Sequence, residues 1–375
     1  MNKLRVGVIY GGRSGEHEVS LASAAAVFKN LDLQRYEAVP IKIEKDGRWT
    51  LPARPPALTS AAEVIAARDD ALDQAREAHL VAHPGTSTLL SIDRTSSQSM
   101  VSGLTLDVIF PVLHGPYGED GTVQGLLELA NLPYVGAGVL ASAVGMDKAV
   151  MKLVFAARGL PICDYVVLTR RDWHRDERAS MHDIVNRLGF PVFVKPANLG
   201  SSVGISKAKH ATELRRAIEI AASFDRKIVV EAAVPNAREI EVSVLGNDDP
   251  EASVPGEVVP SREFYDYQAK YLDDDSRLLI PAPLAEPQAA EVRRLAIEAF
   301  KAVDGSGLAR VDFLLGGDSG ALYVSELNTL PGFTTIGMYA KLWAATGVDF
   351  PHLLDRLIQL ALDRHAEKQQ LRTSM

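Results

Sequence analysis

The stretch ARVDFLLGGDSGALYVSELNTLPG, residues 309–332, contains two apolar runs on either side of a Gly-rich segment. Alternate side chains of an extended strand point to opposite faces, so Arg310 and Asp312 share one face of the first run. Glu326 and Asn328 share one face of the second run. The GGDSG segment between the runs is typical of a hairpin turn. A turn centred on that segment pairs even-numbered positions with each other, so the sequence predicts that the four polar side chains meet on one face.

Two carboxylates at contact distance repel each other, and a cation between them removes that repulsion. Two carboxylates and an amide oxygen are hard ligands that suit magnesium, which fills its octahedron with phosphate oxygens and water. Taken alone, the hairpin is equally consistent with one solvated face of an antiparallel sheet. The segment KPANLGSSVGIS, residues 195–206, favours the metal site. It is not a P-loop, because its lysine precedes the glycines, but a lysine beside a Gly/Ser loop is suited to bind phosphates.

The composition excludes several other classes of protein. The chain has 375 residues, enough for two or three domains, and a net charge of −8, which argues against a nucleic-acid partner. Cys163 is the single cysteine, so no disulfide forms within the chain, as is typical of a reducing cytosol. The apolar run at the N-terminus is too short for a signal peptide, and no run reaches the length of a membrane span. We therefore expect a cytoplasmic protein without a membrane partner.

Periodicity predicts an α/β domain followed by α+β segments. The run LRVGVIY, residues 4–10, followed by a glycine loop and a helix, is typical of the first unit of a parallel sheet. Residues 60–82 have helical charge spacing, with HLVAH at a helix end, and the Gly/Ser/Thr-rich residues 84–103 indicate an exposed excursion. A central α+β unit is expected to carry the Gly/Ser loop on a hairpin, and the long loop 261–282 is expected to be functional.

A set of motifs, all in one order along the chain, resembles those of a known family. They are GGRSGEHEVS (11–20), LHGPYGEDGTVQGLLE (113–128), GMDK (145–148), KPANLGSSVGISKA (195–208), FYDYQAKY (264–271), RVDF (310–313) and ELNTLPGFT (326–334). The chain thus resembles the D-alanine–D-alanine ligase family of the ATP-grasp superfamily. The resemblance implies a Rossmann-like N-terminal domain (1–136) that binds substrate, a central ATP-grasp lobe with a phosphate lid (137–231), and a C-terminal lobe with the metal site (232–375).

The resemblance implies a reaction in which ATP phosphorylates the carboxylate of one D-alanine and the amine of a second D-alanine displaces phosphate. The product would be D-alanyl-D-alanine for peptidoglycan synthesis. ATP and two magnesium ions, or manganese in their place, are the implied cofactors, and a homodimer is the implied assembly. The alternatives are a D-alanine–D-lactate ligase, another ATP-grasp carboxylate–amine ligase, and a nucleotide-binding regulator without activity. Tyr271 in the AKY segment favours the dipeptide over the ester.

The resemblance also implies roles for individual residues. Glu16 would bind the ammonium of the first D-alanine, with His114 nearby, and Ser201 and Tyr271 would bond to Glu16 and close the site. Lys270 would reach the γ-phosphate or the second substrate. The residues expected to contact ATP are Lys148, Lys195, Ser202, Glu231, Ala233, Val234 and Glu239.

Three residues would hold the metal: Asp312, Glu326 and Asn328. Arg310 and the Gly332 amide would stabilise the tetrahedral intermediate. The sequence departs from the family at Gly337, where a serine often helps to hold the carboxylate of the second substrate. Outside this family, Glu16 would be a helix-terminal acid favoured by the macrodipole, His114 a hydrogen-bonded loop histidine, and Tyr271 a surface side chain.

Overall fold

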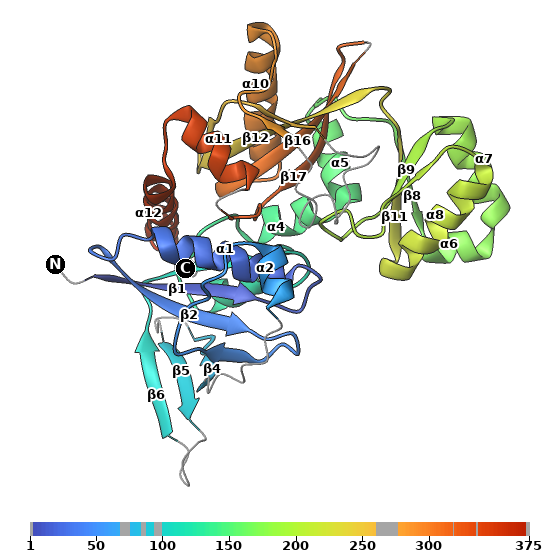
Figure 1. Ribbon diagram of the computed structural model, residues 1–375. Helices are drawn as coiled ribbons and strands as arrows, with labels where there is room; N and C mark the ends of the chain where they lie inside the picture. The colour runs from blue at the N-terminus through green and yellow to red at the C-terminus, as the bar shows by residue number, and fades with distance from the viewer. Residues whose placement is uncertain are drawn as a thin grey trace.

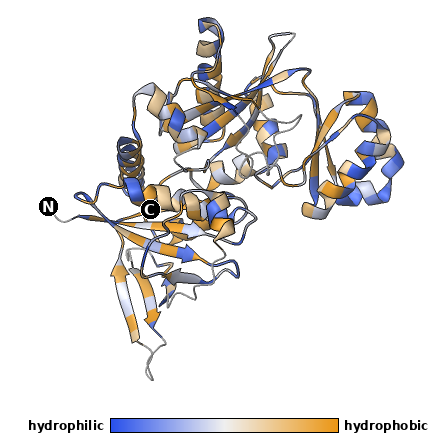
Figure 2. Ribbon diagram, in the orientation of Figure 1, coloured by the Kyte–Doolittle hydropathy of each residue, from blue (hydrophilic) through white to orange (hydrophobic). Residues whose placement is uncertain are grey.

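The computed structural model describes residues 3–67, 76–83, 88–93, 100–259, 277–317, 319–334 and 337–372. These residues form three β-sheets, one after another along the chain (Figure 1). The strands carry the hydrophobic side chains, and the outer helices of the central domain are largely hydrophilic (Figure 2). None of the helices in the described ranges combines the length and apolar character needed to cross a bilayer.

The N-terminal sheet has a parallel centre, as the sequence predicts. Strand β1 (Leu4–Gly11) pairs in parallel with β2 (Tyr36–Ile43) on one side and with β7 (Val108–Leu113) on the other. Helix α1 (His17–Asn30) follows β1 and packs on this sheet, as the β–glycine–α pattern requires. The carboxyl ends of β1 and β7 therefore lie together, which brings their following loops to one edge of the sheet.

The prediction of a helix over residues 60–82 was wrong for the described residues beyond residue 66, whereas residues 100–103 of the expected excursion are exposed as predicted. Helix α2 is short (Ala61–Ala66), and the sheet continues in antiparallel pairing through β3 (Trp49–Leu51) and three further strands. These are β4 (Arg76–Leu80), β5 (Thr88–Asp93) and β6 (Met100–Thr105). On β4, buried Ala78 alternates with the more exposed Glu77 and His79, which is the period of a strand rather than of a helix. HLVAH therefore begins on a strand and is not a helix end.

The central domain is a four-stranded antiparallel sheet in the described residues, with strands β8 (Tyr165–Thr169), β9 (Val192–Pro196), β10 (Ser206–Ala208) and β11 (Lys227–Ala232). Helices α6 (Arg170–Arg175), α7 (Glu177–Leu188) and α8 (Ala211–Phe224) complete its own apolar core. The Gly/Ser loop connects β9 to β10, which confirms the predicted hairpin.

The C-terminal sheet has the order β15-β14-β12-β16-β17, with β13 paired to β12. Its strands are β12 (Ala237–Gly246), β13 (Glu251–Ala252), β14 (Gly256–Val259), β15 (Arg277–Leu279), β16 (Gly307–Gly316) and β17 (Leu322–Asn328). Helix α10 (Glu286–Ala302) packs on β12, β16 and β17.

The described residues form five further helices: α3 (Thr122–Leu129), α4 (Val139–Met146), α5 (Lys148–Ala157), α11 (Met338–Thr346) and α12 (Phe350–Lys368). Met151 and Phe155 of α5 belong to the core of the C-terminal sheet. Residues of α12 instead share one apolar cluster with β1 and β7, so the C-terminal helix packs on the N-terminal domain.

Candidate active site

The predicted carboxylate hairpin is confirmed. Arg310 pairs with Asn328 and Asp312 pairs with Glu326 across β16 and β17. Towards the turn the register shifts by one residue, so that Phe313 pairs with Val324. The even-numbered pairing at the site therefore depends on a β-bulge, a feature that commonly redirects side chains beside functional sites.

Arg310 lies between two carboxylates, and 15% of its side-chain surface is exposed. Its Nε and Nη2 donate to the two Asp312 oxygens at 2.7 and 2.6 Å, and Nε lies 3.1 Å from Glu241 Oε2. Burial alone would lower the pKa of Arg310, but the charges of Asp312 and Glu241 raise it well above its usual value. The sequence analysis missed Glu241, although it lies directly opposite Asp312 on β12.

Two carboxylates and one amide are the donors that this face offers to a metal. Asp312 and Glu326 are direct cross-strand partners, and the amide of Asn328 follows on the same face of β17. Within the described residues, this hairpin included, no group of three or more His, Cys, Asp or Glu side chains is arranged to hold a metal ion, and the third donor here is an amide. Hard oxygen donors opposed across a hairpin fit magnesium.

Lys148 connects this hairpin to the Gly/Ser loop. Its ammonium donates to the Leu199 carbonyl oxygen at 2.7 Å and lies 3.9 Å from Glu326 Oε2. Its backbone N–H donates to the Ala197 carbonyl oxygen at 3.0 Å. Asp147 caps the helix that begins at Lys148, which fixes the direction in which the lysine leaves the backbone.

Lys195 and Glu231 form a buried ion pair on neighbouring strands of the central sheet, with Nζ 2.9 Å from Oε2. Lys152 of α5 lies 3.3 Å from the other oxygen of Glu231 and is fully buried. Burial would raise the pKa of Glu231, but Lys152 and Lys195 lower it below its usual value. The sequence analysis missed Lys152, although its position four residues after Lys148 places both on one helix face.

The tip of the Gly/Ser loop reaches the N-terminal domain. Ser201 Oγ donates a hydrogen bond to Glu16 Oε1, and an ideal Cβ on Gly200 would lie 2.8 Å from Glu16 Oε2. The loop backbone therefore approaches Glu16 closely, and a side chain at position 200 would have to displace the Glu16 carboxylate. Ser201 and Ser202 adopt left-handed φ values of 49° and 59°, which are strained for residues with a Cβ.

Glu119 is a buried carboxyl that the sequence analysis did not single out. The Gly115 N–H donates to its Oε1 at 2.8 Å. Burial, together with the charge of Glu16, raises the pKa of Glu119 to about 8. The only signal for it was its place in the LHGPYGEDG segment.

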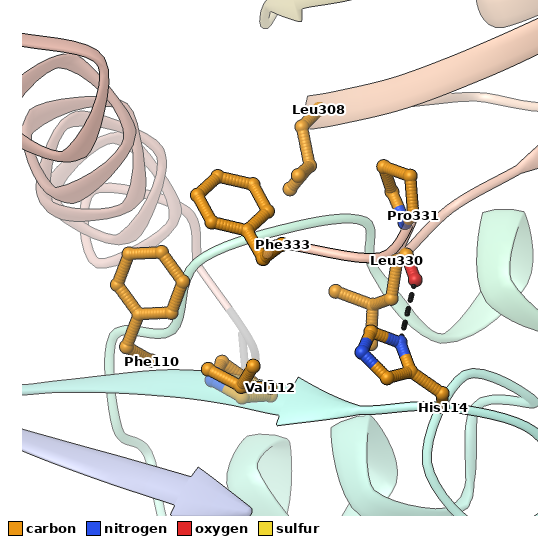
Figure 3. Close-up of a pocket in the computed structure, with 8 residues that line it drawn as sticks. Phe110, Val112, His114, Leu308, Leu330, Pro331 and Phe333 are labelled. Carbon is orange, nitrogen blue, oxygen red and sulfur yellow. Dashed lines mark hydrogen bonds between the residues drawn. The ribbon is translucent and has the colours of Figure 1, made fainter. Parts of the chain in front are cut away.

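His114 lies at the end of β7 with both ring nitrogens engaged by protein groups. Nδ1 lies 3.0 Å from the Leu330 carbonyl oxygen (Figure 3), and Nε2 lies 3.1 Å from Ser23 Oγ. The side chain is buried, and burial lowers its pKa. A substrate contact through a ring nitrogen would have to replace one of these two bonds.

The remaining predicted residues lie apart from these contacts or outside the described residues. Ala233 and Val234 follow β11, and the Ala233 N–H donates to the Pro191 carbonyl oxygen at 3.0 Å. Glu239 lies on β12. Lys270 and Tyr271 fall outside the described residues.

The backbone around Gly337 leaves no room for a side chain. An ideal Cβ at this position would lie 2.8 Å from the Gly332 carbonyl oxygen and 3.1 Å from that of Thr334. Both contacts are with backbone, so a side chain here would require the turn to shift.

Comparison with known proteins identifies close relatives over the whole chain. The models of the D-ala D-ala ligase N-terminus and C-terminus match residues 5–137 and 154–359. A D-alanine–D-alanine ligase of Heliobacterium modesticaldum is 50% identical over 369 residues, covering 98% of this chain and 97% of the relative. One of Bacillus cytotoxicus is 49% identical over 372 residues, covering 99% of each chain.

Two solved structures have the same fold. The D-alanine–D-alanine ligase of Coxiella burnetii superposes with a TM-score of 0.81 at 36% identity, covering 99% of this chain and 97% of that one. The VanG D-Ala:D-Ser ligase of Enterococcus faecalis superposes with a TM-score of 0.82 at 32% identity, covering 96% and 100%.

Proposed function

The chain belongs to the D-alanine–D-alanine ligase family, and we propose residue by residue how it carries out that family's reaction. It is an ATP-dependent, ADP-forming ligase with the ATP-grasp fold that joins two D-alanines for peptidoglycan synthesis. The D-lactate alternative is not favoured, because the curated relatives are named for the dipeptide.

In this proposal Glu16 binds the ammonium of the first D-alanine. A buried carboxylate at the edge of the N-terminal sheet is a strong acceptor for an ammonium. The carboxylate of that D-alanine attacks the γ-phosphorus of ATP, and ADP leaves. The amine of the second D-alanine then attacks the acyl carbon, loses a proton, and displaces phosphate.

The lysines position the nucleotide. Lys148 and Lys195 bind phosphate oxygens, and Lys195 exchanges its bond to Glu231 for one to phosphate. Lys152 then remains beside Glu231 and balances its charge while that carboxylate meets the adenine or ribose. Ser202, Ala233, Val234 and Glu239 complete the proposed nucleotide contacts, and Lys270 and Tyr271 the proposed contacts from the long loop.

Asp312, Glu326 and Asn328 would hold magnesium, two ions in our proposal, with manganese as a substitute. Bound there, the metal would neutralise charge on the phosphates. Arg310 and the Gly332 amide stabilise the oxyanion of the tetrahedral intermediate, where Arg310 balances charge and the amide donates a hydrogen bond.

The single observation that carries these roles is the position of Lys148. Its ammonium contacts the Gly/Ser loop at Leu199 and lies near Glu326 of the metal hairpin. The Gly/Ser loop and the metal hairpin, which are more than 100 residues apart in the sequence, therefore both approach the Lys148 ammonium. A site that binds ATP together with a metal ion requires such an arrangement.

The proposal is tested by phosphate release from ATP with D-alanine, L-alanine, D-lactate or no substrate, together with analysis of the products. We expect release that depends on D-alanine and yields the dipeptide. Glu326→Gln should lower kcat by at least about 10³-fold, because it removes a charged ligand of the metal. Turnover that survives in Glu326→Gln would refute the metal site.

We further propose the division into domains 1–136, 137–231 and 232–375, a homodimeric assembly, and a cytoplasmic location. Helices α4 and α5 fall within the range 137–231 of the central lobe but pack in the core of the C-terminal sheet. Sedimentation equilibrium of the full chain would test the assembly.

A further inference from the structure

Two hydrogen bonds connect the N-terminal domain to the turn that contains Gly332, and a third joins the two side chains that make them. The Phe333 N–H donates to Ser23 Oγ at 3.1 Å, Ser23 Oγ lies 3.1 Å from His114 Nε2, and His114 Nδ1 lies 3.0 Å from the Leu330 carbonyl oxygen. All three bonds are buried, and Ser23 is fully inaccessible to solvent. The chain of bonds therefore begins and ends on the same four-residue turn.

The direction of each bond follows from its acceptor. A carbonyl oxygen only accepts, so His114 Nδ1 must carry the proton that it donates to Leu330. The buried ring is neutral because burial lowers its pKa, which leaves Nε2 as an acceptor for the Ser23 hydroxyl. The Ser23 oxygen in turn accepts from Phe333. Every donor and acceptor in this relay has one defined partner, so the relay admits a single arrangement.

The two anchors lie on either side of Gly332. Leu330 is held from one side and Phe333 from the other, with Pro331 restricting the backbone between them. Behind the turn, the Phe333 ring packs on Phe110 at a centroid distance of 5.8 Å (Figure 3). A cavity of about 10 Å³ there is lined mainly by apolar side chains and is too small for a ligand.

We propose that Ser23 is a positioning residue, which with His114 fixes the Leu330–Phe333 turn so that the Gly332 amide meets the oxyanion of the tetrahedral intermediate. The inference rests on the role proposed above for Gly332. It assigns control of this C-terminal backbone donor to a helix of the N-terminal domain, the domain that also binds the first D-alanine. An oxyanion donor misplaced by about 1 Å costs on the order of 10²-fold in rate.

The chain supplies a matched control in Ser20. It is a buried serine on the same helix, and its hydroxyl bonds the Gly11 N–H and the Val112 carbonyl oxygen, both within the N-terminal sheet. Ser20→Ala therefore removes a buried hydroxyl from α1 without touching the turn. Ser23→Ala removes one that holds the turn.

The experiment measures kcat, KM for ATP, and the inhibition constant of a dipeptide phosphinate, in which tetrahedral phosphorus replaces the attacked carbon. For Ser23→Ala we expect kcat and phosphinate affinity to fall together by about 10- to 100-fold, with KM for ATP within about twofold of wild type. Ser20→Ala should keep the wild-type kcat and phosphinate affinity even where it loses as much stability. Ser23→Cys, which fills the site with a weaker hydrogen-bonding group, should fall between wild type and Ser23→Ala.

The inference is overturned if folded Ser23→Ala keeps the wild-type kcat. It is also overturned if Ser20→Ala and Ser23→Ala lose kcat and phosphinate affinity to the same extent. If Ser23→Ala does not fold, wild-type turnover of Ser23→Cys overturns it in the same way. A wild-type protein that makes no dipeptide would instead overturn the function from which the inference starts, so the two failures are distinct.

Discussion

The C-terminal sheet meets its two neighbours through different chemistry. Its contact with the N-terminal domain is mainly one apolar cluster that includes Val108, Phe333 and Leu357, to which Ser23 and His114 add buried hydrogen bonds. Its contact with the central domain passes through α5 and includes ion pairs as well as a small apolar cluster: Lys227 of β11 lies 2.5 Å from Asp147, and Lys152 lies against Glu231. Apolar burial is insensitive to small changes of geometry, whereas ion pairs exchange readily for other charged partners. The comparison indicates a fixed N-terminal contact and a central contact that nucleotide can reorganise.

The largest expected effect comes from the apolar contact. Leu357 on α12 is fully buried, so Leu357→Ala should lower the free energy of unfolding by about 2–5 kcal/mol through lost burial and a cavity. Urea denaturation measures this free energy. Leu371 is exposed, so Leu371→Ala serves as a control whose free energy of unfolding should lie within about 0.5 kcal/mol of wild type. KM for ATP should stay unchanged. A loss as small as that of the control would mean that this contact is not the fixed one.

The next effect comes from the buried ion pairs of the central domain. Lys152→Met leaves one oxygen of Glu231 without its cation, and we expect a loss of about 1–3 kcal/mol in the free energy of unfolding. KM for ATP should rise about tenfold, because Lys195 is then drawn more strongly to Glu231 and less to phosphate. Lys152→Arg keeps the charge and should restore most of the affinity. An unchanged KM for ATP in Lys152→Met would separate this cluster from nucleotide binding.

A third prediction concerns Glu119, which lies where the Gly/Ser loop meets the N-terminal domain, and the pH dependence of the free energy of unfolding. Burial and the charge of Glu16 raise the pKa of Glu119 from 4.5 to about 8. The folded protein therefore keeps a proton that the unfolded chain releases above about pH 4.5. The stability from this proton is fully present below pH 4.5 and is lost as the pH rises through about 8. The slope is at most about 1.4 kcal/mol per pH unit.

Glu119→Gln removes that proton equilibrium and retains an oxygen that accepts from the Gly115 N–H. We expect its unfolding free energy to vary less between pH 5 and 8 than that of wild type, as measured by urea denaturation at several pH values. Equal slopes for the two proteins would contradict the raised pKa.

The sequence predicted those parts of the site whose geometry is local. The period of two predicted that Arg310 and Asp312 share one face of their strand, and that Glu326 and Asn328 share one face of theirs. The sequence did not predict the β-bulge after Asp312. That bulge brings Asp312 opposite Glu326, and it depends on packing against the rest of the sheet. The resemblance to the family, rather than periodicity, indicated the contact of Glu16 with the Gly/Ser loop.

The errors arose where local and tertiary preferences differ. Residues 60–82 carry helical charge spacing, yet β4 forms there because Ala78 packs in the core of the N-terminal sheet. Lys152 and Ser23 were missed for a related reason. Each acts by contacting a residue far along the chain, Glu231 and Phe333 respectively, and one sequence contains no signal for such a pairing.

The smallest effect on stability should accompany a clear effect on turnover. Ser201→Ala removes the hydrogen bond to Glu16 from a half-buried loop tip, so the free energy of unfolding should change by less than about 0.5 kcal/mol. Turnover should nevertheless fall about tenfold, because that bond holds the Gly/Ser loop over the site while the first D-alanine reacts. Ser206→Ala on β10 of the same hairpin is the control and should keep wild-type kcat. If Ser201→Ala lowers stability but keeps wild-type turnover, the contact between the central and N-terminal domains is structural and does not hold the Gly/Ser loop closed over the site.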